Sequence, residues 1–248
     1  MRTNKEYRKI LQLWDAGNNK SKIARQTNIP RGTVRYCIQK FATEQGLDSY
    51  LSENNTNTWK TRLINKQFRQ TYSYILGIYL GDGYIAKHPR TYRMRIVLDK
   101  KYPQIIEEVT HGLQTLVPSN RIQITPKEGA VEVGAYSNDW VEMFPQHGKG
   151  AKHERDIILE SWQQNIVDEY PIDFIRGLLH SDGTRIEPVV NEAIYSRYEF
   201  TNVSDDIRKL FTDTVEQIGL NWTGWGNRIT IARRDDVAFL DEHIGPKS

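Results

Sequence analysis

A nine-residue pattern that occurs twice constrains the fold of this chain more than any other feature. Residues 75–83 have the sequence ILGIYLGDG and residues 175–183 have the sequence IRGLLHSDG, so the two copies align without a gap. Each copy is apolar, with small residues four positions apart: Gly77 and Gly81 in the first, Gly177 and Ser181 in the second. Positions four apart share one helical face, and small residues let two backbones approach closely. The repeat therefore predicts two helices packed on each other, with Gly77 and Gly177 at the contact.

Both copies end in Asp-Gly, and the two acidic residues are Asp82 and Asp182. Packed side by side, the helices bring these carboxylates together at their C-terminal ends. There the carboxylates repel each other and face the negative ends of two helix dipoles. A divalent cation that prefers oxygen ligands offsets both effects. We therefore predict that Mg²⁺, or Mn²⁺ in its place, binds Asp82 and Asp182 together with the backbone carbonyls of Gly81 and Ser181. A metal held in this way suits phosphodiester hydrolysis.

The two copies resemble the motif that gives the LAGLIDADG homing endonucleases their name, and the resemblance covers about residues 72–245. In that family, single chains with two motifs fold as two αββαββα halves whose antiparallel sheets form a saddle over DNA. The resemblance implies an α+β fold with pseudo-symmetric halves at about 72–147 and 154–245. It also implies that Asp82 and Asp182 are the catalytic metal ligands, and that a monomer with an internal pseudo-two-fold axis binds double-stranded DNA.

Alternating segments follow each motif, as this fold requires. Residues 93–98 and 197–202 alternate between apolar and polar side chains and are predicted to form matching strands. On these strands and on the later hairpins, polar residues of the outward face are candidates to contact base edges: Arg93, Arg95, Arg121, Gln123, Thr125, Arg228 and Thr230. The alternative is a polar sheet face that only contacts water. Glu132 and Glu199 argue against a uniformly basic groove.

The chain departs from the family pattern in one respect. Active members commonly have a basic residue, usually lysine, late in each sheet near the scissile phosphates. Arg233 and Arg234 follow the last strand of the second half and are candidates for this role and for DNA contact. The corresponding stretch of the first half, residues 134–138, has no basic residue. This difference favours nicking or absence of cleavage over symmetrical double-strand cleavage.

The N-terminal residues 1–45 are predicted to form three helices, the second of which opens at Ser21. Residues 21–35 resemble the helix-turn-helix of bacterial regulators and recombinases. In such a motif, the exposed start of the third helix reaches base edges, and here that position holds Arg31, Thr33 and Arg35. The alternative is an ordinary three-helix bundle. Residues 46–71 are polar and are predicted to be a linker to the two-motif domain, residues 72–248. Short helical stretches within this linker are compatible with the sequence.

Charge is distributed unevenly along the chain. Residues 1–71 contain 14 Lys and Arg against 5 Asp and Glu, whereas the remainder contains 20 against 26. A basic head is typical of a protein that binds phosphates, although a merely solvated basic helix is an alternative. No apolar run approaches the length of a membrane span, about 18 residues. The only cysteine, Cys37, cannot form an internal disulfide. We therefore expect a cytoplasmic, nucleoid-associated protein.

These observations predict a Mg²⁺-dependent, site-specific DNA endonuclease of the homing type, with the helix-turn-helix as an added clamp. The alternative is a transcriptional regulator that binds DNA through a catalytically retired domain. Certain bacterial sporulation regulators combine a helix-turn-helix with a degenerate form of this domain. The acidic pair favours the enzyme, because unpaired like charges in close quarters cost stability and a retired site has no reason to keep both.

Overall fold

The computed structural model describes residues 4–41 and 59–244 of the 248-residue chain. The chain divides into two compact units, Met1–Arg62 and Leu63–Ser248, and each is considered by itself. The domain boundary predicted at residue 45 lies outside the described residues. Among the helices that the structure describes, none is long and apolar enough to cross a membrane.

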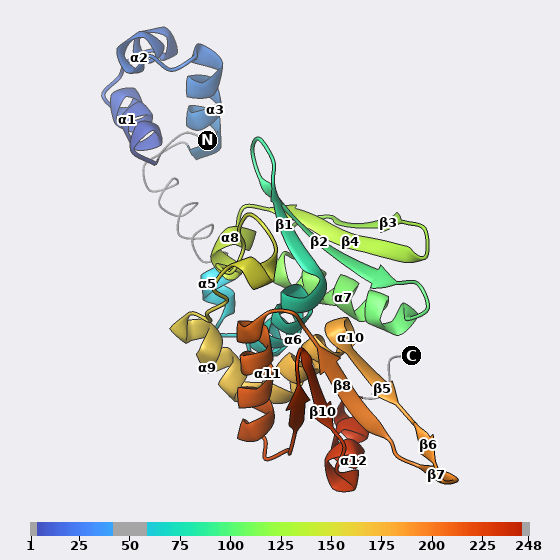
Figure 1. The fold of residues 1–248 in the computed structure, drawn as a ribbon. Helices are drawn as coiled ribbons and strands as arrows, with labels where there is room; N and C mark the ends of the chain where they lie inside the picture. Colours follow the sequence, from blue (N-terminus) through green and yellow to red (C-terminus); the bar gives the residue numbers. More distant parts are fainter. Residues whose placement is uncertain (1–3, 42–58, 245–248) are drawn as a thin grey trace. The chain divides into compact units, whose positions relative to one another are not determined.

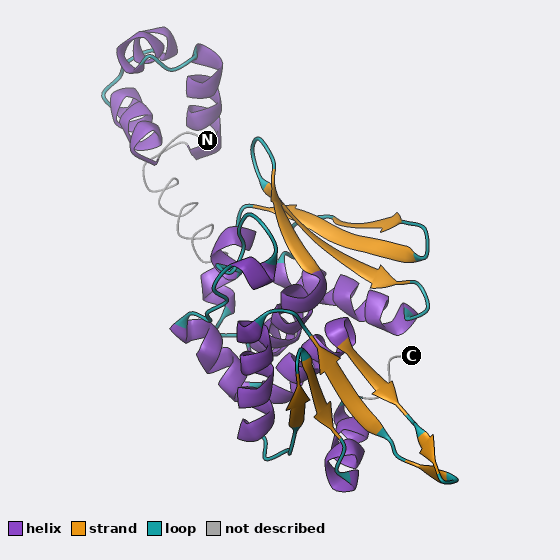
Figure 2. Ribbon diagram, viewed as in Figure 1, coloured by secondary structure: helices purple, strands orange, loops and turns teal. Residues whose placement is uncertain are grey.

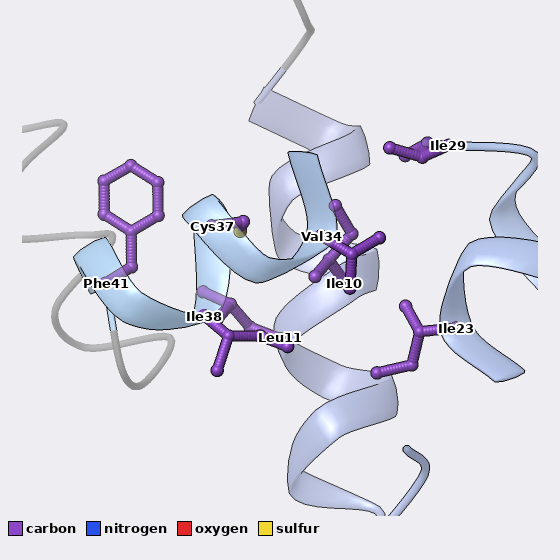
Figure 3. Close-up of a cluster of buried hydrophobic side chains, with 8 residues drawn as sticks. All are labelled: Ile10, Leu11, Ile23, Ile29, Val34, Cys37, Ile38 and Phe41. Atoms are coloured by element: carbon purple, nitrogen blue, oxygen red, sulfur yellow. The ribbon is translucent and has the colours of Figure 1, made fainter. Parts of the chain in front are cut away.

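Among the described residues of the N-terminal unit, three helices build a common core: α1 (Asn4–Asp15), α2 (Lys20–Thr27) and α3 (Arg31–Phe41). Their apolar faces meet in one buried cluster, drawn in Figure 3, of Ile10, Leu11, Ile23, Ile29, Val34, Cys37, Ile38 and Phe41. Residues from all three helices contribute, so the helices form a common core. A short helix, α5 (Trp59–Arg62), follows before the second unit.

Local capping explains where α2 begins and ends. The Asn19 side chain accepts a hydrogen bond from the Lys22 backbone N–H at 2.9 Å, so α2 begins earlier than a Ser21 cap predicts. At the other end, Asn28 adopts a left-handed conformation with φ of 54°, which asparagine tolerates better than most residues. The chain then turns, and the buried Ile29 fills the corner between α2 and α3.

The second unit contains two halves with the same order of main elements (Figure 1). The first half consists of α6 (Lys66–Asp82), β1 (Gly83–Lys87), β2 (Tyr92–Asp99), α7 (Pro103–Leu116), β3 (Ile122–Pro126), β4 (Ala130–Ser137) and α8 (Trp140–Met143). The second half, after a short 3₁₀ turn η1 (Lys152–Glu154) and α9 (Ser161–Glu169), consists of α10 (Pro171–Asp182), β5 (Gly183–Ile186), β6 (Val189–Val190), β7 (Ala193–Ile194), β8 (Arg197–Thr201), α11 (Asp205–Gln217), β9 (Thr223–Trp225), β10 (Arg228–Ile231) and α12 (Arg234–His243).

Each half forms one antiparallel four-stranded sheet, and the two sheets have equivalent strand orders. The first is β1-β2-β4-β3 and the second is β5-β8-β10-β9; both are orange in Figure 2. A small β6–β7 hairpin lengthens the connection between β5 and β8 in the second half alone. The predicted α+β class, with two antiparallel four-stranded sheets, is confirmed.

The predicted linker extends too far toward the C-terminus. Helix α6 begins at Lys66 rather than after residue 71, and the Asn65 side chain caps it by accepting from the Phe68 backbone N–H at 3.2 Å. Phe68 is buried. Polar composition indicated a linker here, but one capping side chain and one buried aromatic residue are enough to extend the helix by a turn and a half.

Helices α6 and α10 approach each other at two glycines. A Cβ added to Gly77 would lie 2.5 Å from the Phe174 carbonyl oxygen, closer than real side chains allow. A Cβ added to Gly177 would collide with the Tyr74 carbonyl and lie 3.0 Å from the Gly77 Cα. Only glycine fits at either position, so this contact sets the distance between the two helices.

Candidate metal site and nucleic-acid interface

The close packing of α6 and α10 brings the ends of the two motifs together. A Cβ on Gly81 would collide with the Ser181 side chain and would lie 3.0 Å from the Asp182 Oδ2 atom. The Asp182 carboxylate therefore lies beside the last turn of the other motif helix. Since Asp82 follows Gly81 directly, both carboxylates belong to the same end of the helix pair.

Neighbouring groups orient the Asp182 carboxylate. The Asn202 side-chain Nδ2 donates a hydrogen bond to Asp182 Oδ2 at 2.6 Å, and the Asn202 side-chain Oδ1 accepts from the Ser204 backbone N–H at 2.8 Å. Asn202 is thus held at both ends of its amide. The Ser181 hydroxyl bonds carbonyls of its own helix, including Leu178 O at 3.0 Å. The backbone oxygen of Ser181, rather than its hydroxyl, is the candidate ligand.

A lysine from the segment that joins the two halves also reaches this site. The Lys152 ammonium donates to the Gly81 carbonyl oxygen at 3.0 Å and to the Tyr79 carbonyl oxygen. Burial lowers the pKa of Lys152 to about 8, and the charges of Asp182 and Asp82 act in the opposite direction. Lys152 is therefore a cation beside the acidic pair, bonded to one of the predicted carbonyl ligands.

The donor atoms at this end of the helices fit a divalent metal that prefers oxygen. A cavity of about 370 Å³ is lined there by Gly81, Asp182, Asn202 and Lys152, among others. Two carboxylates supplemented by carbonyls, water and substrate phosphate are a common set for Mg²⁺. No cluster of three or more His, Cys, Asp or Glu residues occurs in the described part of the chain, so Asp82 and Asp182 would be the only protein carboxylates in the site.

The outer face of the first sheet carries basic side chains close to this site. The strand register pairs Arg95 with Tyr84 and Gly134, and Arg93 with Tyr136, so both arginines lie on the face opposite the core. Each guanidinium lies over a ring, Arg95 over Tyr84 and Arg93 over Tyr136, at 5.2 and 5.5 Å from the centroids. The Nε atoms of both arginines are buried without a hydrogen-bond partner among the described residues. Gln123 and Thr125, which are half-buried on β3, share this face, and the exposed Arg121 precedes that strand.

The second sheet has an equivalent outer face. Arg228 pairs with Thr201 and Trp225, and Thr230 pairs with Glu199, so these residues share one side of the sheet. Trp225 is 89% exposed, the most exposed large hydrophobic residue that the structure describes. An exposed tryptophan on a polar sheet face is a candidate for contact with a ligand, because a large aromatic ring gains much from burial.

The two glutamates on these faces are compensated. Glu132 is nearly buried, and its Oε1 atom forms an ion pair with Nη2 of Arg93 at 2.8 Å. Glu199 is likewise nearly buried and pairs with Arg197 at 2.9 Å and Arg228 at 3.4 Å. Each glutamate fixes the orientation of arginines instead of leaving an uncompensated negative charge in the face.

Comparison with known proteins supports this architecture. No family model matches the chain. An uncharacterized protein of Methanocaldococcus jannaschii, MJ0398, is 26% identical to this chain over 174 residues. The match covers 67% of this chain and 53% of MJ0398, so the chain spans about half the length of this relative. The structure of I-DmoI in complex with DNA and Mn superposes with a TM-score of 0.50 at 19% identity, covering 72% of this chain and 97% of I-DmoI. A structure of mesophilic variants of the homing endonuclease I-DmoI has a TM-score of 0.51 at 18% identity, covering 73% of this chain and 97% of that chain.

The fold is the LAGLIDADG fold. Helices α6 and α10 are its two motif helices, and the two four-stranded sheets are its paired sheets. In this fold, Asp82 and Asp182 occupy equivalent positions at the ends of the motif helices.

The structure does not bring Arg233 and Arg234 to the acidic pair. Strand β5 starts at Gly183, beside Asp182, and its other end, Ile186, pairs with Arg197. Strand β10 runs from Arg228, at the acidic end, toward Ile231. Arg233 caps α12 beyond that far end, and Arg234 is the first residue of α12. The antiparallel register gives no support to a position of these arginines near a scissile phosphate at the acidic pair, because β10 runs away from that pair.

In the N-terminal unit, the predicted contact residues lie at the start of α3. Arg31 and Arg35 are exposed, whereas Thr33 is half-buried. Tyr36, which is 51% exposed, lies beside them. The sequence interpretation missed Tyr36, although the surrounding basic residues were the signal that could have identified it.

Two further residues were missed, for different reasons. Trp225 precedes the Gly226-Asn227 turn of a hairpin, and a large apolar residue beside a tight turn is a visible signal. Lys152 gave no such signal, because its partners Tyr79 and Gly81 are some 70 residues away in the sequence.

Proposed function

We propose that this chain binds duplex DNA across the outer faces of its two sheets and hydrolyses a phosphodiester at Asp82 and Asp182 with Mg²⁺ or Mn²⁺. The observation that carries the proposal is the position of the acidic pair. Strand β1 begins at Gly83 and β5 at Gly183, directly after the two aspartates. A duplex that contacts both sheets would therefore cross the acidic pair.

The arginines of the first sheet support DNA as the ligand. Buried polar atoms of side chains are normally hydrogen-bonded, yet the Nε atoms of Arg93 and Arg95 are without such a partner in the described part of the chain. A guanidinium is suited to paired contacts with phosphate oxygens or guanine. Ion pairing with Glu132 and ring contact with Tyr136 hold Arg93 in place before a ligand arrives.

The chain's own residues would prepare the reaction as follows. Asp82 and Asp182, with the Gly81 carbonyl, would hold the metal, which when bound supplies an activated water and positive charge at the phosphate. Asn202 keeps Asp182 in position through its 2.6 Å hydrogen bond. Arg228, which lies at the acidic end of the second sheet, would bind a phosphate of the DNA backbone. I-DmoI, which has this fold, has been crystallised with DNA and Mn, and this agrees with the proposed ligand and metal.

The N-terminal unit would act as an added clamp of the helix-turn-helix type. As a clamp, its exposed Arg31 and Arg35 would neutralise DNA phosphates at the start of α3, in addition to any contact with base edges. Replacing both with Gln should weaken DNA binding and make the salt dependence shallower by about two phosphate contacts. If the body supplies the sequence preference, the bound sequence should remain the same.

A second function, DNA binding by a regulator without cleavage, is favoured by one observation. Unpaired carboxylates would make a retired site unstable, but Lys152 supplies a cation beside Asp82 and Asp182. Retention of both aspartates is therefore weaker support for catalysis than the sequence alone suggested.

The test is a selection from a randomised duplex library in Mg²⁺, with bound and cut molecules sequenced separately. We expect one enriched sequence in both pools. Asp82→Asn and Asp182→Asn should abolish cutting and retain binding, and Asp213→Asn, an exposed change on α11, should affect neither. Enrichment in the bound pool only, with Mg²⁺ or Mn²⁺, would leave the regulator as the function. Metal-dependent cutting by either Asn variant would refute the assigned site.

A further inference from the structure

The segment that joins the two halves is held firmly over the end of the motif helices. The Arg155 guanidinium donates to the backbone oxygens of Gln146 at 3.2 Å and Gly150 at 2.7 Å, which closes the loop between them. The Ile157 backbone N–H donates to Asp206 Oδ2 at 2.8 Å, which attaches the segment to α11. These hydrogen bonds make the segment a fixed support for Lys152.

A second network anchors the start of the same segment. The Gln146 side-chain amide donates to Gln163 Oε1 at 2.6 Å and to the Ile158 carbonyl at 2.7 Å. Gln163 in turn donates to the Tyr72 hydroxyl on α6 at 2.7 Å. Gln146 and Gln163 are both buried. Because both ends of the segment are fixed to the core, Lys152 projects from a defined position.

The Lys152 ammonium takes part in three kinds of interaction. It bonds the Tyr79 and Gly81 carbonyls in the last turn of α6, where the helix dipole is negative. It lies 5.0 Å from the centroid of the Tyr79 ring. It also experiences the negative charges of Asp82 and Asp182. These favourable contacts oppose the cost of removing an ammonium group from water.

We propose that Lys152 is a built-in counter-ion for the acidic pair and that it competes with a divalent metal for this site. The inference rests on the proposed metal site. Its physical basis is that the ammonium and the metal need the same Gly81 carbonyl and the same two negative charges. The metal-free protein would keep Asp82 and Asp182 together through Lys152, and a metal would bind tightly only when Lys152 leaves the carbonyl.

The test compares Mn²⁺ binding by the full chain and by two variants, without DNA. Lys152→Met removes the charge and the donors, whereas Lys152→Gln removes the charge but keeps N–H donors for the carbonyls. A nearby like charge commonly changes the affinity for a proton by tenfold or more, so we expect Lys152→Met to bind Mn²⁺ about tenfold more tightly than the wild type. Lys152→Gln should show a smaller gain, because it keeps a donor for the Gly81 carbonyl. Lys149→Met, an exposed change in the same loop, is the matched control and should leave the affinity unchanged.

Unchanged or weaker Mn²⁺ binding by Lys152→Gln would overturn the proposal, because a lysine that only caps α6 has no effect on the metal. A second measurement applies if Lys152→Met folds poorly. In EDTA, Asp182→Asn should lower the melting temperature in the wild-type background and raise it in the Lys152→Gln background. The same effect in both backgrounds would contradict a counter-ion role.

Failure of the proposed function can be distinguished from failure of the competition between Lys152 and the metal. If the wild type neither cuts nor binds duplex DNA while the Lys152 variants still bind Mn²⁺ more tightly, then the proposed function fails and the competition stands. If DNA is cut and the Lys152 variants bind Mn²⁺ as the wild type does, then the competition fails and the enzyme stands.

Discussion

Replacing Gly177 with Ala adds one methyl group at the contact between the two motif helices. In an exposed helix, this change normally stabilises by about 1 kcal/mol, because glycine loses more backbone entropy on folding. Here the new Cβ would collide with the Tyr74 carbonyl oxygen and lie 2.9 Å from the Ile78 backbone nitrogen. Both obstacles are backbone atoms of α6, which cannot move aside as a flexible side chain can.

The magnitude follows from how far the helices must separate. An ordinary contact needs 3.4 Å or more, so α6 and α10 would have to move apart by roughly 1 Å. A gap of that size forfeits about a quarter to a half of each van der Waals contact across it. Overpacking of this kind costs about 1–3 kcal/mol. We take the upper end, because the obstacle is backbone, and subtract the helix-propensity gain. The expected loss is about 2 kcal/mol, or a melting temperature lower by about 4–8 °C for a unit of this size.

Urea and thermal unfolding followed by circular dichroism measure this effect, and two other glycines serve as controls. A Cβ on Gly112 would meet the end of the Ile75 side chain at 2.6 Å, which can shift, so Gly112→Ala should cost less. A Cβ on Gly32 in α3 meets nothing within 4 Å, so Gly32→Ala should stabilise the N-terminal unit by about 0.5–1 kcal/mol. A Gly177→Ala protein at least as stable as the wild type would refute the reasoning.

Three further predictions concern the stability of the protein, the accessibility of its thiol and its binding of DNA. Asp241→Asn should lower the unfolding free energy by about 1–2 kcal/mol at pH 7. It removes the carboxylate charge and one of the two oxygen atoms that accept from Arg185, at 2.6 and 2.9 Å. Arg185 holds the pKa of Asp241 below its usual range. The stabilisation by Asp241 is therefore present above the unfolded-state pKa of about 4 and is lost as pH falls through the folded-state pKa. Urea melts that show the same difference between wild type and variant at pH 7 and at pH 3 would be inconsistent with this. Burial raises the pKa of the Cys37 thiol to about 11. Iodoacetamide at pH 8 should therefore label Cys37 only as fast as the N-terminal unit unfolds. Immediate labelling, seen in mass spectra, would show that the thiol is accessible. Trp225→Ala should weaken duplex binding by about tenfold in fluorescence titrations, as truncation of an aromatic interface residue commonly does. Trp222→Ala, an exposed neighbour bonded to Glu216, should not, and equal effects would remove the assigned contact.

The repeated motif contains most of the information about the fold. The four-residue spacing of its small residues predicts that the two motif helices pack closely. The structure shows this close packing at Gly77 and Gly177. Strand alternation also identifies the faces, since Met94 and Ile96 are buried while Arg93 and Arg95 lie opposite. These features depend on local periodicity, which a sequence displays directly.

Features that depend on register or on distant contacts could not be predicted in this way. The position of Arg233 required the direction of β10 relative to Asp182, which follows from pairing rather than from composition. The contact of Lys152 with Gly81 depends on how residues 144–160 fold over α6. Polar composition likewise gave no sign that Lys66 begins a helix, because that helix depends on a cap and on tertiary burial.

Hydroxyl-radical footprinting on the selected duplex tests most directly whether the two sheets form one DNA-binding surface across the acidic pair. The wild type should protect two adjacent half-sites that meet at the acidic pair. Arg95→Gln, in the first sheet, should weaken protection of one half-site, and Arg228→Gln, in the second, should weaken the other. A footprint that persists in both variants and disappears only when Arg31 and Arg35 are replaced would contradict the account, because recognition would then belong to the N-terminal unit alone.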